Sequence, residues 1–181
     1  MTQQYSQVNN LQLAQSTNST DGDFSALIPT LTRPARSATR AVFDLGKPGL
    51  RSSNVIVVYP FGGSSDNETI NVKVSGWNFS KDGGTRGMWV STLICEVAAT
   101  LSSTLVGLAN EDVVATEFFA DILSLTKGKA SLYQGTSNVD IARFKAPVSG
   151  FEIIELTFDL GTADTQNAMV RFDHDTSPLE V

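Results

Sequence analysis

The chain has 181 residues, an apolar fraction of 41%, a formal net charge of -6 and an isoelectric point near 4.7. This length is enough for one compact domain with an extended segment. The acidic balance argues against general nucleic-acid binding, because phosphate contacts require Lys and Arg. No apolar run of about 18 residues predicts a transmembrane helix, and the residues from Met1 to Tyr5 lack the pattern of a secretory signal.

The first forty residues read as an extended arm. Residues 1–32 are rich in Gln, Asn, Ser and Thr, and their few apolar residues follow no period. This composition is typical of a disordered tail or of an arm that becomes ordered on a neighbouring subunit. In the second interpretation the anchor is the apolar group Phe24, Leu27 and Ile28.

Positive charge gathers at the end of this arm, in Arg33, Arg36 and Arg40. Two interpretations are open: a solvated loop, or an electrostatic contact with an acidic partner surface. No aromatic residue lies between these arginines to stack on bases, so nucleic acid fits less well. We therefore expect an arm over residues 1–40, a β domain over 41–175 and a flexible tail over 176–181.

Alternating apolar and polar residues predict most of the strands. The central feature is a long hairpin, in which Ile70, Val72 and Val74 face one way and a nearly continuous apolar run, Met88–Val97, reads as a strand covered on both faces. Turns rich in Gly, Pro, Asn and Asp separate the segments. The other predicted strands cover residues 41–45, 54–59, 140–145, 151–160 and 167–173; the β pattern of the hairpin continues over 100–108, and residues 132–133 read as a short edge piece.

Residues 110–125 fit two structures. Asn110 could cap a helix in which Val114, Phe118 and Ile122 share one face. The β-branched and aromatic residues favour a strand instead, and we expect a loop followed by a strand over 118–125. About eight strands without alternating helices predict an all-β fold, an antiparallel sandwich, jelly roll or barrel.

The sequence offers no recognisable catalytic constellation. His174 is the single histidine, which leaves no Ser-His-Asp or zinc site away from the chain end, and Asp173 and Asp175 beside it could bind a hard cation only weakly. Glu152 and Glu155 have opposite strand parity, so we expect their side chains to point to opposite faces of the sheet and not to form a catalytic carboxylate pair. We therefore expect no enzymatic activity, no bound cofactor and no metal site. Cys95 reads as a small buried side chain, and a lone cysteine fits assembly in a reducing cytoplasm.

Trp77 belongs by parity to the polar face of its strand, with Lys73 and Ser75. An outward tryptophan is typical of a subunit contact or a sugar-binding platform, and the alternative is a ring folded over the core at the strand end.

Four segments of the chain carry a resemblance to known proteins: D-N-E-T-I-N-V-K-V-S-G-W, M-W-V-S-T-L-I-C-E-V-A-A-T-L, F-F-A-D-I-L and G-F-E-I-I-E-L-T-F-D-L-G-T-A-D-T-Q-N-A-M-V-R. Together they resemble small virion proteins of tailed bacteriophages, most of all the auxiliary proteins that decorate or cement the capsid. The resemblance covers residues 54–172. It implies a β-rich protein, often a homotrimer, that binds the major capsid protein on the virion surface without a cofactor, nucleic acid or membrane.

Two other interpretations stay open. One is another virion component, such as a head-fibre base, tail or baseplate protein. The other is a carbohydrate-binding or adhesion module that uses Trp77, Tyr59 or Tyr133 as a platform.

Overall fold

The computed structural model describes ten strands, joined in one antiparallel sheet. The residues it describes are 9–11, 40–47, 50, 53–81, 87–102, 118–134 and 141–174. The strands are β1 (Asn9–Leu11), β2 (Arg40–Asp44), β3 (Val55–Gly62), β4 (Thr69–Lys81), β5 (Gly87–Ser102), β6 (Phe118–Gly128), β7 (Ser131–Tyr133), β8 (Arg143–Pro147), β9 (Ile153–Leu160) and β10 (Gln166–Asp173).

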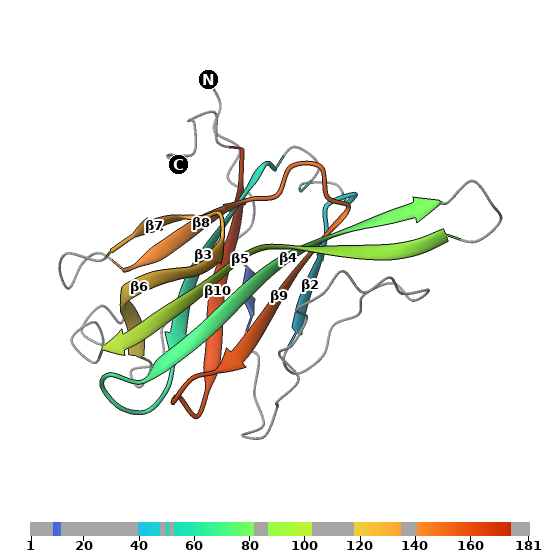
Figure 1. The fold of residues 1–181 in the computed structure, drawn as a ribbon. Coiled ribbons are helices and arrows are strands. Elements are labelled where there is room, and N and C mark those ends of the chain that lie inside the picture. Colours follow the sequence, from blue (N-terminus) through green and yellow to red (C-terminus); the bar gives the residue numbers. More distant parts are fainter. Residues whose placement is uncertain are drawn as a thin grey trace.

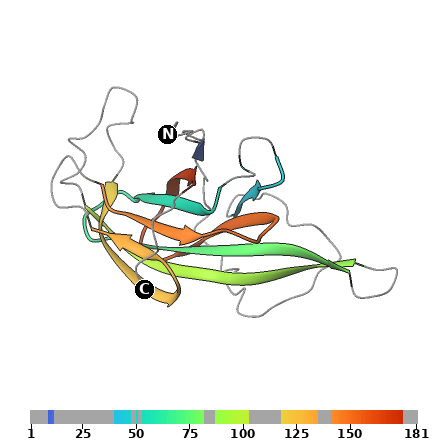
Figure 2. The same cartoon turned by 90° about the horizontal axis from the view of Figure 1, so that it is seen from above.

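The sheet folds onto itself to make two packed layers (Figures 1 and 2). The strand order is β1-β10-β3-β6-β5-β4-β9-β2, and β8 pairs with β3 and carries β7. β3 pairs with β8 through its first half and with β6 only through Phe61 and Gly62. The layers meet where Phe43 of β2 packs edge-on against Phe172 of β10, with ring centroids 5.0 Å apart. The predicted all-β antiparallel sandwich is therefore confirmed, whereas the jelly-roll arrangement stays a prediction.

Period-two alternation places the core between the layers. Every second residue is buried from Ile70 to Val74 in β4, from Ile154 to Phe158 in β9 and along β10, as the sequence predicts, and a buried apolar residue stabilises the fold by about 1.5–3 kcal/mol. Cys95 is fully buried, and burial raises the pKa of its thiol to about 12. These inward residues are Ile70, Val72, Val74, Ile154, Leu156, Phe158, Ala168, Val170 and Phe172.

Several strand boundaries agree with the sequence-based predictions, and one strand is longer than predicted. A strand over 118–125, the short piece at 132–133 and the hairpin of β4 with β5 are confirmed. The predicted strand over 54–59 instead continues through Pro60 to Gly62. Pro60 pairs with Ala168 on one side, while on its other side it lies between the residues that pair with β8 and those that pair with β6. A proline is tolerated there because its missing N–H removes no bond from a continuous ladder.

Two predictions about faces were wrong. The run Met88–Val97 does not lie in a strand covered on both faces, because Thr92 of β5 is exposed and Leu93 and Glu96 are only half-buried. By contrast β9, predicted to have one polar face, buries Glu155 and Thr157 as well as its apolar face. The prediction of a strand over 100–108 holds as far as Ser102, and the rest lies outside the described residues. In the part of the chain that is described, no helix has the length and hydropathy to cross a membrane.

Candidate interaction surface

The outer face of β2, β9 and β4 carries a buried polar cluster around Glu155. Register places Ser75 and Val42 directly opposite Glu155 on its two neighbouring strands. The Glu155 side chain is 1% exposed, its Oε1 accepts a hydrogen bond from the Thr157 hydroxyl at 3.2 Å, and its Oε2 lies 3.6 Å from Nε of Arg40. Two sequence-predicted interface residues, Arg40 and Trp77, therefore meet at Glu155, which the sequence did not predict as part of an interface.

Burial raises the pKa of Glu155, because a charged carboxylate loses solvation there. The positive charge of Arg40, the Thr157 hydroxyl and the indole N–H of Trp77 act in the opposite direction and lower it. The indole lies close enough to influence the carboxyl group, yet within the described structure Trp77 Nε1 and Glu155 Oε2 are both buried without a hydrogen bond of standard geometry. The cluster fixes the start of β2, where the N-terminal segment joins the body.

The β4–β5 hairpin extends beyond the body as a two-stranded ribbon (Figures 1 and 2). The last residue of β4 that pairs with β9 is Trp77, opposite Ile153. Beyond it, β4 and β5 pair only with each other, from Asn78 opposite Val90 to Lys81 opposite Gly87. We call this segment, residues 78–81 and 87–90, the ribbon. Phe79 faces Trp89 across it, with ring centroids 5.3 Å apart, and Phe79 is 37% exposed.

The turn between β8 and β9 braces the root of the ribbon. Asn78 donates from Nδ2 to the Gly150 carbonyl at 2.9 Å, and its Oδ1 accepts the Glu152 N–H at 3.0 Å. Glu152 Oε1 in turn accepts the Phe79 N–H at 3.1 Å. Below them the Phe151 ring occupies the space that a side chain at Gly76 would need. An isolated two-stranded ribbon is marginally stable in water, so these contacts help to hold its direction.

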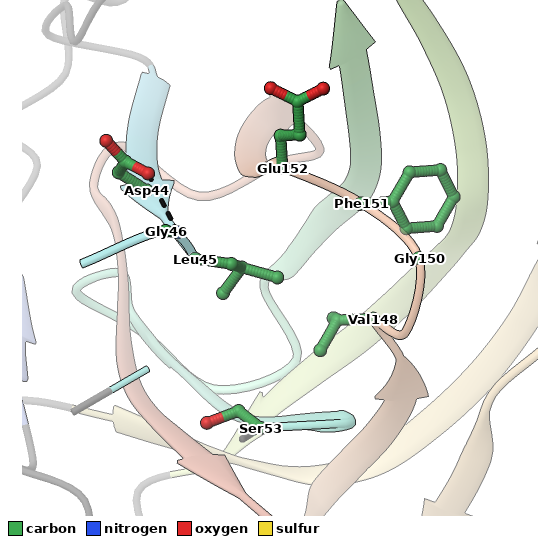
Figure 3. A pocket seen from close by; sticks show the side chains of 8 residues that line it. All are labelled: Asp44, Leu45, Gly46, Ser53, Val148, Gly150, Phe151 and Glu152. Atoms are coloured by element: carbon green, nitrogen blue, oxygen red, sulfur yellow. Dashed lines mark hydrogen bonds between the residues drawn. The ribbon is translucent and has the colours of Figure 1, made fainter. Parts of the chain in front are cut away.

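A hollow of about 270 Å³ lies beside this turn (Figure 3). Leu45 and Val148 point toward one another across it, whereas the carboxylates of Asp44 and Glu152 point away from it and from each other. Both carboxylates already accept backbone hydrogen bonds, Asp44 from Gly46 at 2.9 Å and Glu152 from Phe79. Asp44 therefore stabilises the turn after β2 and Glu152 stabilises the root of the ribbon, and the two do not form the facing carboxylates that acid–base chemistry requires.

Two further acidic residues, Glu68 and Asp173, also have structural partners. Glu68 caps the turn after β3 by accepting the N–H groups of Ser64 and Ser65 at 2.7 and 3.2 Å. Asp173 beside His174 forms an ion pair with Arg171 at 2.8 Å. Within the residues that the structure describes, no three metal-ligating side chains form a group.

The predicted interface residues fall into two sets. Trp77 lies on the outer face, as parity predicted, but it is only 3% exposed, so its ring is part of a packed surface. Sequence reasoning missed Phe79 and Trp89, although their aromatic character on either side of a Gly-rich turn was a usable signal. The remaining predicted residues, Phe24, Leu27, Ile28, Arg33 and Arg36, lie outside the described residues.

Comparisons with protein family models, curated proteins and solved structures find no match to this chain.

Proposed function

We propose that this protein is a structural component of a tailed-phage virion that decorates or cements the capsid by binding the major capsid protein and neighbouring copies of itself. The proposal includes a homo-oligomer, with a trimer as the expected state, assembled in the host cytoplasm and carried on the capsid surface. It assigns no enzymatic activity and no cofactor. The sequence resemblance to capsid decoration proteins supports the choice of partner.

The observation that carries the proposal is the braced ribbon. It projects from a packed β body, its root is held by Asn78 and Glu152, and it presents Phe79 to solvent. Exposed aromatic residues on a rigid support are typical of the centres of protein interfaces. The predicted arm over residues 1–40 would add a second contact that wraps the partner, at the cost of its ordering entropy.

The test is co-sedimentation of the purified protein with bare, mature phage heads. We expect saturable pelleting with a stoichiometry that matches a multiple of the symmetry sites of the capsid. Deletion of residues 1–39 should abolish pelleting and leave the body folded. The deletion ends before Arg40 because that residue contacts Glu155.

A matched pair of point variants separates the ribbon from general surface hydrophobicity. Phe79→Ala should weaken head binding by about tenfold or more, the effect of losing an interface anchor of about 1.4 kcal/mol. Ile122→Ala, which truncates an exposed apolar residue on β6, is the control and should bind normally. Normal binding by both the deletion and Phe79→Ala would contradict the proposed contacts, and absence of pelleting by the folded wild-type protein would contradict the decoration role.

Carbohydrate binding is the second candidate, and Tyr133 is the residue that favours it. Tyr133 is 38% exposed, although the guanidinium carbon of Arg143 lies 3.9 Å from the centroid of its ring and covers one face. Calorimetric titration with oligosaccharides tests this candidate, and Tyr133→Ala should abolish any binding found. A fibre-base, tail or baseplate role is distinguished from decoration by the position and copy number of the protein in the particle.

A further inference from the structure

The outer edge of β10 is built to accept a strand. β10 pairs with β3 over its whole length in an unbroken register from Gln166 opposite Gly62 to Asp173 opposite Val55. A long, regular strand at the end of a sheet presents a row of backbone N–H and C=O groups to any extended segment that can reach it. Such an edge is a template for strand addition, within one chain or between chains.

The structure shows what pairs with this edge. β1 lies antiparallel to β10, with Asn9 opposite Val170, Asn10 opposite Met169 and Leu11 opposite Ala168. Three residue pairs form only a few hydrogen bonds, each contributing about 0.5–1.5 kcal/mol net. The pairing is thus weak by itself and depends on how its strand is tethered.

The connection between β1 and β2 is much longer than pairing of β1 with β10 within one chain requires. Residues 12–39, 28 in number, separate β1 from β2. β1 pairs with β10, and β10 itself lies close to β2, because Phe43 of β2 packs against Phe172 of β10. Most connections in compact domains have about 4–6 residues. Fully extended, 28 residues reach about 95 Å, whereas a body of this size has an expected radius of gyration of about 14 Å.

We propose that the β10 edge binds the segment Asn9–Leu11 of a second copy of this chain, so that neighbouring copies are joined by exchanged strands. The same antiparallel pairing can form between copies with unchanged local geometry, as in domain swapping. A closed ring gives every β10 edge a strand, and several weak pairings act together through their high effective concentration. This inference concerns contacts between copies and does not depend on the proposed capsid partner.

The experiment tests the register between chains with cysteines. Asn10→Cys is made in one tagged chain and Met169→Cys in a second chain with another tag, both with Cys95→Ala, and the two are co-expressed and oxidised. Positions 10 and 169 are chosen because Ala168 and Val170, which flank Met169, are buried, whereas Met169 is only partly covered. Directly opposed strand residues have the Cα separation that a disulfide needs. We expect a disulfide that joins the two tagged chains.

The matched control pairs Asn10→Cys with Ser64→Cys, an exposed turn position that does not pair with β1. It should give at least fivefold less of the joined product. A single chain carrying both Asn10→Cys and Met169→Cys should form covalent oligomers. A disulfide confined to one chain, or equal yields with positions 169 and 64, would overturn the proposal.

A second measurement needs no cysteine. Deletion of residues 1–11 should lower the oligomer mass measured by light scattering, while near-ultraviolet circular dichroism shows an intact body. An unchanged mass, or a wild-type protein that is monomeric at all concentrations tested, would also overturn the inference. Since no capsid is present, failure here and failure of head binding are separate results.

Discussion

Glu155 is the residue whose environment departs furthest from what the sequence indicated. Alternation along β9 predicted a polar outer face, and burial of that face puts a carboxyl group next to Arg40, Thr157 and Trp77. The sequence identified two members of this cluster, Arg40 and Trp77, from charge and from parity. The sequence could not predict that Glu155 is buried beside them, because pairing of β9 with both β2 and β4 depends on contacts between residues far apart in the chain.

The raised pKa of Glu155 predicts a pH-dependent stability. A carboxyl group whose pKa is higher in the folded state than its usual 4.5 stabilises the fold fully below that value. Its contribution is lost as the pH rises through the folded pKa. We therefore expect the free energy of unfolding to fall as the pH rises above 4.5, by at most about 1.4 kcal/mol per pH unit from this group.

Glu155→Gln should remove this component, and urea unfolding from pH 4 to 8 measures it. Carbon-13 NMR of the Glu155 carboxyl reports its titration directly. A pH dependence identical in the wild-type protein and Glu155→Gln would contradict the assignment.

At the scale of elements, the braced ribbon depends on a glycine in the middle of a strand. A Cβ atom at Gly76 would overlap the Phe151 ring. Gly76→Ala should therefore lower the free energy of unfolding by about 1–3 kcal/mol, the usual cost of overpacking. In a Phe151→Ala background the same substitution should cost less. Thermal unfolding of the four proteins in this cycle gives the interaction energy, and strictly additive effects would contradict a direct contact.

The Gln134 side chain forms with the backbone of β6 the pair of hydrogen bonds that a neighbouring strand would form. Gln134 accepts the Leu123 N–H at Oε1 and donates from Nε2 to the Leu123 carbonyl, both at 2.7 Å. Gln134→Ala should destabilise the fold by about 1–2 kcal/mol and accelerate hydrogen exchange at the Leu123 amide. Gln134→Glu retains an acceptor for that amide and should have a smaller effect on its exchange. Equal exchange rates in all three proteins would show that these hydrogen bonds do not protect β6.

For the whole molecule, the sequence predicted strands better than it predicted their neighbours. Period-two patterns and turn residues located the β4–β5 hairpin, β9 and β10, since those signals are local. Pairing of β3 with β10 and of β2 with β9 joins segments about 100 residues apart, and no local pattern encodes it. For the same reason the sequence suggested an arm but gave no sign that residues 9–11 pair with β10.

The separation of these pairings has a consequence for how the chain folds. The β4–β5 hairpin needs only a short loop to close, and hairpins form in about 1–10 μs. Strands β3 and β10 must instead close a loop of about 100 residues, which makes their pairing late and the overall folding slow. Pulse-labelled hydrogen exchange during refolding should protect amides of β4 and β5 before those of β3 and β10. Simultaneous protection of all four strands would contradict this order. During the delay the edges of the early hairpin are unpaired, so refolding at high protein concentration should favour aggregation.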